Sequence, residues 1–168
     1  MTSPTISTSG TRAVVRVELE IAASPEQVRA VFLDLERYKE WHTSFITCIE
    51  PLPIPSTDDS DEPCNSPAIR AGDKIKVHAG GVEIEPTVLV NTPSEFRWFG
   101  STMGGAFAGE HYFIFAETET GGTKFVHGED YTGWLTFLFR PGWPLHNHTR
   151  ELYAGFARDL KARVERLP

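Results

Sequence analysis

Regular alternation of hydrophobic and polar residues begins at residues 12–22. The hydrophobic members of this pattern are Val15, Val17, Leu19 and Ile21. A period of two is typical of a strand with one buried face, so the segment is predicted to be a strand. Ser24, Pro25 and Gln27 follow directly and have the spacing of a capping box with proline at the first helical position. The chain is therefore expected to pass from this strand straight into a helix.

The pattern after Pro25 has helical spacing and continues to about Trp41. Its hydrophobic positions are Val28, Val31, Phe32, Leu35 and Tyr38. One helix, or two short helices split near Asp34, would fit this spacing. A second strand is predicted over residues 45–52, and a loop rich in proline and aspartate over residues 51–71. The loop has no periodicity, which favours disorder over the alternative, a lid above a binding site.

From residue 72 onward the pattern predicts a meander of strands joined by turns. Gly80-Gly81 and Gly121-Gly122 have the composition of tight hairpin turns. The expected strands cover residues 75–79, 82–90, 95–100, 109–117 and 123–132, with a glycine-rich connection over 101–108. Pro86 indicates an edge position or a bulge, because proline cannot donate a hydrogen bond to a neighbouring strand.

The C-terminal segment, from about Leu145 to Arg166, is predicted to be one long amphipathic helix. Its inner face comprises Leu145, Thr149, Leu152, Tyr153, Phe156, Leu160 and Val164. An antiparallel meander has one face to cover, and this helix is the only predicted element long enough to cover it. The fold class is therefore α+β, with a single domain over residues 12–168 and a disordered tail over residues 1–11.

Composition and charge narrow the function classes. The 168 residues are 40% hydrophobic and 23% charged, values typical of a globular domain. A net charge of −7 disfavours binding to nucleic acid and to anionic membranes. No segment has the length of a membrane span or the features of a secretory signal. Cys48 and Cys64 lack metal or redox spacing, and free thiols in a cytoplasmic protein are favoured over a disulfide between them.

Several segments share sequence patterns with one protein family. The first strand runs into ASPEQVRAVFLDLERYKEWH, and the later segments are AGDKIKV, EFRWFG, GEHYFIF and FVHGEDYTGWL. In order and spacing they resemble the START/birch-pollen-allergen superfamily, also called SRPBCC or polyketide cyclase/dehydrase-like, over residues 12–166. The resemblance implies a helix-grip fold, in which a curved antiparallel sheet of about seven strands wraps around the C-terminal helix. It also implies an apolar cavity between sheet and helix, suited to hydrophobic or lipid-like ligands.

The strands predicted over residues 109–117 and 123–132 bring polar side chains onto one face. Alternation puts His111 on one face of the first strand, and His127 and Glu129 on one face of the second. The other members of these faces are Phe113, Phe115, Phe125 and Tyr131. Because the strands are expected to be hairpin partners, the three polar residues should lie within cross-strand reach. The aromatic neighbours indicate that this face looks inward.

Two imidazoles and one carboxylate in an apolar wall could serve as general acid and base, with Tyr131 as a hydrogen-bond donor. Orientation of a ligand is one alternative, and a pair that only satisfies its own hydrogen bonds is another. The residues expected to contact a ligand are Trp41, Trp98, Phe113, Phe115, Phe125, Tyr131 and Phe156. Simple core packing is the alternative for the two tryptophans.

Other polar residues are expected to have no part in chemistry. The resemblance puts His42 at the pocket mouth, and surface exposure is favoured over a ligand contact. Arg97 alternates away from Trp98 and is expected to face solvent. His146 and His148 are two positions apart, which does not bring them to one face of a helix, so no metal site is predicted.

Three functions fit these expectations. The first is binding of a hydrophobic small molecule, aromatic, lipid-like or polyketide-like, in the internal cavity. The second is a cyclase, dehydratase or isomerase that needs no cofactor and uses His111, His127 and Glu129 as acid–base residues. The third is a protein-interaction module, which the charged, mixed outer face makes the least favoured.

Overall fold

The computed structural model describes residues 12–52 and 69–167. The strands in these ranges are β1 (Ala13–Ile21), β2 (Ile46–Pro51), β3 (Ile75–Ala79), β4 (Val82–Ile84), β5 (Thr87–Thr92), β6 (Glu95–Thr102), β7 (Phe107–Glu117) and β8 (Thr123–Thr132). The helices are α1 (Pro25–Leu33), α2 (Tyr38–Trp41) and α3 (Pro144–Val164), with short 3-10 helices η1 (Leu35–Arg37), η2 (Met103–Gly105) and η3 (Thr136–Phe139). The predicted tail, residues 1–11, and residues 53–68 of the predicted loop lie outside the described residues.

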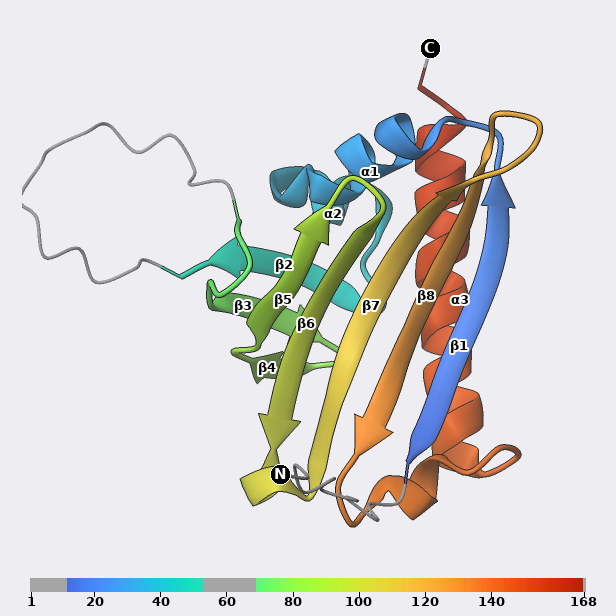
Figure 1. The fold of residues 1–168 in the computed structure, drawn as a ribbon. Helices are drawn as coiled ribbons and strands as arrows, with labels where there is room; N and C mark the ends of the chain where they lie inside the picture. Colours follow the sequence, from blue (N-terminus) through green and yellow to red (C-terminus); the bar gives the residue numbers. More distant parts are fainter. Residues whose placement is uncertain (1–11, 53–68, 168) are drawn as a thin grey trace, which may run out of the picture.

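The strands form two antiparallel sheets. The larger sheet has the order β1-β8-β7-β6-β5, and the smaller has the order β2-β3-β4. Figure 1 shows the long helix α3 lying along one face of the larger sheet, behind β8 and β1. The short helices α1 and α2 lie at one end of this sheet. This arrangement confirms the predicted α+β helix-grip fold.

The sheet differs from the expectation in one respect, because the described strands number eight and belong to two sheets. The segment predicted as one return strand, residues 82–90, is divided at Glu85 and Pro86. Its halves, β4 and β5, pair in different sheets. Pro86 has no N–H to donate, and its carbonyl oxygen accepts from Ile75 N–H at 3.1 Å. The chain therefore crosses between the sheets at the residue that the sequence marks as irregular.

The predicted local signals around the first helix are confirmed. Ser24 Oγ accepts a hydrogen bond from the Gln27 N–H at 3.3 Å, and the Gln27 side chain accepts from the Ser24 N–H at 3.1 Å. This reciprocal pair satisfies two N–H groups that a helix start leaves without partners. The helical segment is interrupted at Asp34, after which η1 and α2 continue to Trp41. Neither η2 nor η3 follows from the sequence pattern.

An aromatic core fills the space between α1, α3 and the larger sheet. Its fully buried aromatic residues are Phe32, Tyr38, Phe96, Phe113, Phe115, Phe125 and Phe156. The rings of Phe32 and Phe113 are 4.6 Å apart between centroids, and the Tyr38 hydroxyl donates to the Phe32 carbonyl at 2.6 Å. Burying each such side chain contributes roughly 1.5–3 kcal/mol, so this cluster dominates the stability of the fold.

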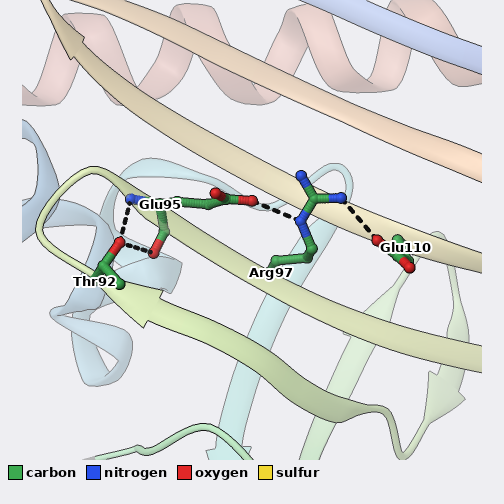
Figure 2. A network of polar contacts seen from close by, with 4 residues as sticks. All are labelled: Thr92, Glu95, Arg97 and Glu110. Atoms are coloured by element: carbon green, nitrogen blue, oxygen red, sulfur yellow. Dashed lines mark hydrogen bonds and ion pairs between the residues drawn. The ribbon is translucent and has the colours of Figure 1, made fainter.

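The outer face of the larger sheet carries a separate polar network. Figure 2 shows Arg97 between two carboxylates, with Nε 2.6 Å from Glu95 and Nη1 2.8 Å from Glu110. The guanidinium lies 4.8 Å above the centre of the Tyr112 ring. Arg97 lies on the face opposite Trp98, as expected, but only 22% of its side chain is exposed. Its flat head pairs on both sides and stacks on an aromatic ring, which removes most of it from water.

Candidate functional site

The antiparallel register of β7 and β8 brings the predicted polar residues together on the inner face. His111 lies opposite Glu129, and Phe113 lies opposite His127. His111 Nδ1 is 3.1 Å from Glu129 Oε2, and His111 Nε2 is 2.8 Å from His127 Nε2. A two-residue repeat on each strand is sufficient to produce this chain of contacts, because the turn at Gly121 and Gly122 fixes the register.

Helix α3 completes the cluster with a residue that the sequence does not single out. The Tyr153 hydroxyl donates to Glu129 Oε2 at 2.6 Å. It also lies 2.9 Å from the Tyr131 hydroxyl, and its ring stacks on His127 with centroids 4.1 Å apart. Tyr153 belongs to the inner face of the predicted helix, but the rotation of that helix against the sheet is a tertiary property. Glu129 and the four neighbours named here, His111, His127, Tyr131 and Tyr153, are called the polar cluster below.

The proton positions in the polar cluster follow from its partners. An ionised carboxylate only accepts, so His111 Nδ1 carries a proton and donates to Glu129. One proton lies between His111 Nε2 and His127 Nε2, because two bare nitrogens would repel at 2.8 Å. His127 Nδ1 is buried and has no hydrogen-bond partner within the described part of the chain. His111 is thus the only one of the two imidazoles that can pass a proton between a carboxylate and another base.

Burial and hydrogen bonding set the charges of the cluster. Burial raises the pKa of Glu129, but the hydrogen bond and charge of His111 and the hydrogen bond from Tyr153 outweigh it and leave that pKa below its usual range. Burial, together with the charge of His111, holds the pKa of His127 well below 6.5. Burial also raises the pKa of both tyrosine hydroxyls. Near neutral pH, Glu129 is therefore ionised, His127 is neutral, and both tyrosines keep their protons and donate.

A cavity of about 360 Å³ opens beside this cluster. Four members of the polar cluster line it: His111, Glu129, Tyr131 and Tyr153. Its apolar wall is built from Phe45, Ile84, Trp98, Phe107, Phe139 and Leu145. The indole ring of Trp98 stacks on the His111 ring at 4.8 Å between centroids. A mostly apolar hollow with a few converging polar groups is the usual form of a small-molecule site.

Two of the seven residues expected to contact a ligand, Trp98 and Tyr131, line this cavity. The structure places Trp41, Phe113, Phe115, Phe125 and Phe156 outside its wall. The four phenylalanines are fully buried in the aromatic core, and Trp41 packs on Phe156 with ring centroids 5.4 Å apart. Alternation identifies an inward-facing side chain but not whether the space in front of it is filled. His127 likewise lies behind His111, away from the cavity.

His42 is buried, so the expectation of surface exposure is wrong. Its side chain is 1% exposed. His42 Nδ1 lies 2.8 Å from Asp159 on α3, and His42 Nε2 accepts from the Phe45 N–H at 3.0 Å. These two bonds use both ring nitrogens, so His42 ties the end of α2 to α3. It has a structural role and does not line the cavity.

Among residues 12–52 and 69–167, no group of three or more His, Cys, Asp or Glu side chains is arranged to hold a metal ion. In the same residues, no helix has both the length and the apolar character needed to cross a membrane.

Residues 12–167 match the sequence profile of a family described as polyketide cyclase/dehydrase and lipid transport. The chain belongs to this family. The match covers both sheets, α3 and every residue of the polar cluster. The family includes members associated with cyclisation and members associated with lipid transport, so it supports ligand binding or cyclase chemistry in general terms. No curated protein sequence matches the chain.

Solved structures show the same fold at low sequence identity. A START superfamily protein from Mycobacterium smegmatis is 19% identical, with a TM-score of 0.58, and 93% of this chain and 99% of that chain are covered. A norcoclaurine synthase point mutant from Thalictrum, in complex with a transition-state analogue, is 12% identical, with a TM-score of 0.60 and coverage of 94% and 96%. A protein from Thermus thermophilus is 21% identical, with a TM-score of 0.60 and coverage of 90% and 96%. These similarities establish the fold, whereas the function must be argued from the site.

Proposed function

We propose that this polyketide cyclase/dehydrase and lipid transport family member binds a hydrophobic small molecule in the cavity beside the polar cluster. The observation that carries the proposal is an apolar hollow with one ionised carboxylate, Glu129, in its wall. Its volume of about 360 Å³ lies near the lower end of the ~300–1,000 Å³ range of small-molecule sites. A ligand of one to three rings is the size that this space favours.

Ligand binding would depend on two kinds of side chain in the cavity wall, the apolar ones and the polar cluster. Aromatic and aliphatic side chains offer contact area, which favours apolar ligands by about 25 cal/mol per Å² removed from water. The four members of the polar cluster in the wall are hydrogen-bonded to one another, so they form one polar patch that can hold a polar group of the ligand and fix its orientation. Hydrogen bonds among its own members hold these side chains in place before a ligand arrives.

Native mass spectrometry of the gently purified protein tests this proposal. The expected result is a bound mass that denaturation releases as a discrete hydrophobic molecule. A filled variant for comparison is Ala79→Phe, because Ala79 lines the cavity and a bulky ring there would occupy part of it. Retention of the same molecule by the filled variant, or lack of binding of any apolar compound by the wild-type protein, would contradict the proposal.

A second candidate function is cofactor-independent proton transfer, as in a cyclase, dehydratase or isomerase. The observation that favours it is the chain from Glu129 through His111 to His127, whose first two members line the cavity. Ionised Glu129 can accept a proton from a ligand carbon or hydroxyl. Glu129 can return that proton to an oxygen of the same ligand, so the transfer balances on one carboxyl group. His111, whose two ring nitrogens bind Glu129 and His127, holds the carboxylate in position.

Deuterium exchange measures this chemistry without knowledge of the natural substrate. The enolisable ketone 2-tetralone, incubated in D₂O with the protein, would gain deuterium faster than in buffer if Glu129 removes a proton. Glu129→Gln should abolish the acceleration, whereas Glu110→Gln, on the outer face of the same hairpin, should leave it intact. Equal exchange with wild-type protein and Glu129→Gln would remove the catalytic hypothesis and leave the binding proposal standing.

A further inference from the structure

The carboxylate of Glu129 is held so that part of it remains available to a ligand. About four acceptor positions exist on a carboxylate, and the side chains of His111 and Tyr153 occupy two of them. Both of the short contacts, from His111 and Tyr153, end on Oε2. At least one acceptor position, on the Oε1 side, is left, and 19% of the side chain is accessible.

Strand β7, which pairs with the strand of Glu129, has room for Glu129 Oε1 at Gly109. A Cβ atom added to Gly109 would lie 2.8 Å from Glu129 Oε1, closer than such atoms approach. Gly109 faces Tyr131 in the β7–β8 register and also lines the cavity. The glycine therefore allows Oε1 to lie against β7 beside the cavity, and any larger residue at this position would displace the carboxylate.

The remaining groups on the cavity wall determine which ligands this carboxylate tolerates. The described residues that line the cavity include no lysine or arginine. The phenol hydroxyls of Tyr131 and Tyr153 are directed at each other and at Glu129. An anionic ligand would bring a second negative charge beside Glu129 in an apolar site, where like charges repel more strongly than in water. A ligand with an O–H or N–H group would instead fill the open acceptor position.

Resting on the proposed function, we propose that the cavity selects apolar molecules that present a hydroxyl or ammonium donor to Glu129 and rejects those that carry a carboxylate. The site is thus a receptor for phenol-, alcohol- or amine-bearing ring compounds, and it excludes free fatty acids and aromatic acids. Glu129 and Gly109 act together as the specificity-determining pair, Glu129 as the acceptor and Gly109 as the residue small enough to accommodate its carboxylate.

Three probes with one skeleton test this inference by calorimetric titration of the full-length protein at pH 7: 2-naphthol, 2-aminomethylnaphthalene and 2-naphthoate. The expected result is that the tighter of the two donor probes binds at least about tenfold more strongly than the carboxylate, the ratio that one charge-assisted hydrogen bond gives. Comparing hydroxyl with ammonium identifies which donor the site prefers. Binding of 2-naphthoate as tightly as both donor probes overturns the inference while leaving the proposed function intact.

Two matched variants sharpen the result. Glu129→Gln removes the charge at nearly constant shape, so the preference for the donor probes over 2-naphthoate should shrink by about tenfold. Glu110→Gln makes the same change on the outer face and should leave the preference unaltered. If Glu129→Gln fails to fold, the wild-type series alone still decides. If none of the three probes binds the wild-type protein, this inference and the proposed function both fall.

Discussion

The two ends of the inner face of β7 and β8 use the same strands and the same helix, yet one is filled and the other is hollow. Near α1, Phe113 packs on Phe32 and Phe156, Phe115 packs on Phe125, and all five rings are fully buried. Toward η3, the same two strands continue with small and polar residues, and a cavity of about 360 Å³ remains. Side-chain volume along a strand thus separates the part that stabilises the fold from the part that can hold a ligand.

The hollow end owes its shape to small residues as much as to polar ones. Gly100, Ala108 and Gly109 line the cavity where β6 and β7 approach their shared turn. Phe139 of η3 stacks on Tyr131, with ring centroids 3.8 Å apart, and both rings line the cavity. The polar cluster occurs where packing is incomplete, as expected if those side chains serve a ligand in addition to each other.

The largest expected effect is on the free energy of unfolding, which should fall more for a substitution at the packed end than for one at the hollow end. Phe113→Ala removes a fully buried ring and should lower the free energy of unfolding by about 3–5 kcal/mol. Phe107→Ala, in the cavity wall, should cost less, about 1–2 kcal/mol, because that ring has empty space on one side and fewer contacts to lose. Urea denaturation of both variants measures this. Equal losses would mean that the hollow end is packed as tightly as the core.

The next effect concerns two buried tyrosine hydroxyls, one at each end. Tyr153→Phe removes a donor to ionised Glu129 and should cost about 1.5–3 kcal/mol of unfolding free energy. Tyr38→Phe, at the packed end, removes a donor to a backbone carbonyl and should cost only about 1 kcal/mol. Loss of the Tyr153 hydroxyl should also raise the pKa of Glu129, which an NMR titration of its carboxyl carbon would follow. An unchanged pKa would show that this hydrogen bond does not stabilise the ionised form.

Much of this arrangement could be predicted from the sequence, and the rest could not for physical reasons. Alternation and the Gly121-Gly122 turn are local, so they place His111, His127 and Glu129 on one face. The position of Tyr153 depends on how α3 is rotated against the sheet, which no local pattern records. The hollow depends on η3, on Phe45 just before β2 and on Ile84 in the smaller sheet, and these come together only after folding. For that reason five inward-facing aromatic residues that the pattern assigns to the ligand lie elsewhere.

A smaller effect should appear in the pH dependence of stability. The folded pKa of His127 lies well below 6.5, so below pH 6.5 the unfolded chain takes up a proton that the folded protein refuses. Stability from this group is present above pH 6.5 and decreases as the pH falls, by at most about 1.4 kcal/mol per pH unit. Urea unfolding between pH 7 and pH 5 should show this slope, and His127→Phe should reduce it. An unaltered slope in the variant would assign the pH dependence to other groups.

The smallest effect is expected on the outer face. Arg97→Met breaks ion pairs with Glu95 and Glu110 but keeps a long side chain over Tyr112. The free energy of unfolding should fall by no more than about 1 kcal/mol, since partly exposed ion pairs contribute little. Calorimetric titration with 2-naphthol should give the same affinity as for the wild-type protein. A weakened affinity would show that the outer network, shown in Figure 2, is coupled to the cavity.

The measurement that tests the contrast between the two ends most directly is an NMR titration of ¹⁵N-labelled protein with 2-naphthol. Saturable shifts should appear at backbone amides around the cavity, such as Gly100, Gly109, Tyr131 and Leu145. The amides of Phe32, Phe115 and Phe125, at the packed end, should remain in place. Shifts centred on the packed end, or no saturable shifts at the cavity amides, would contradict the assignment of the hollow end as the ligand site.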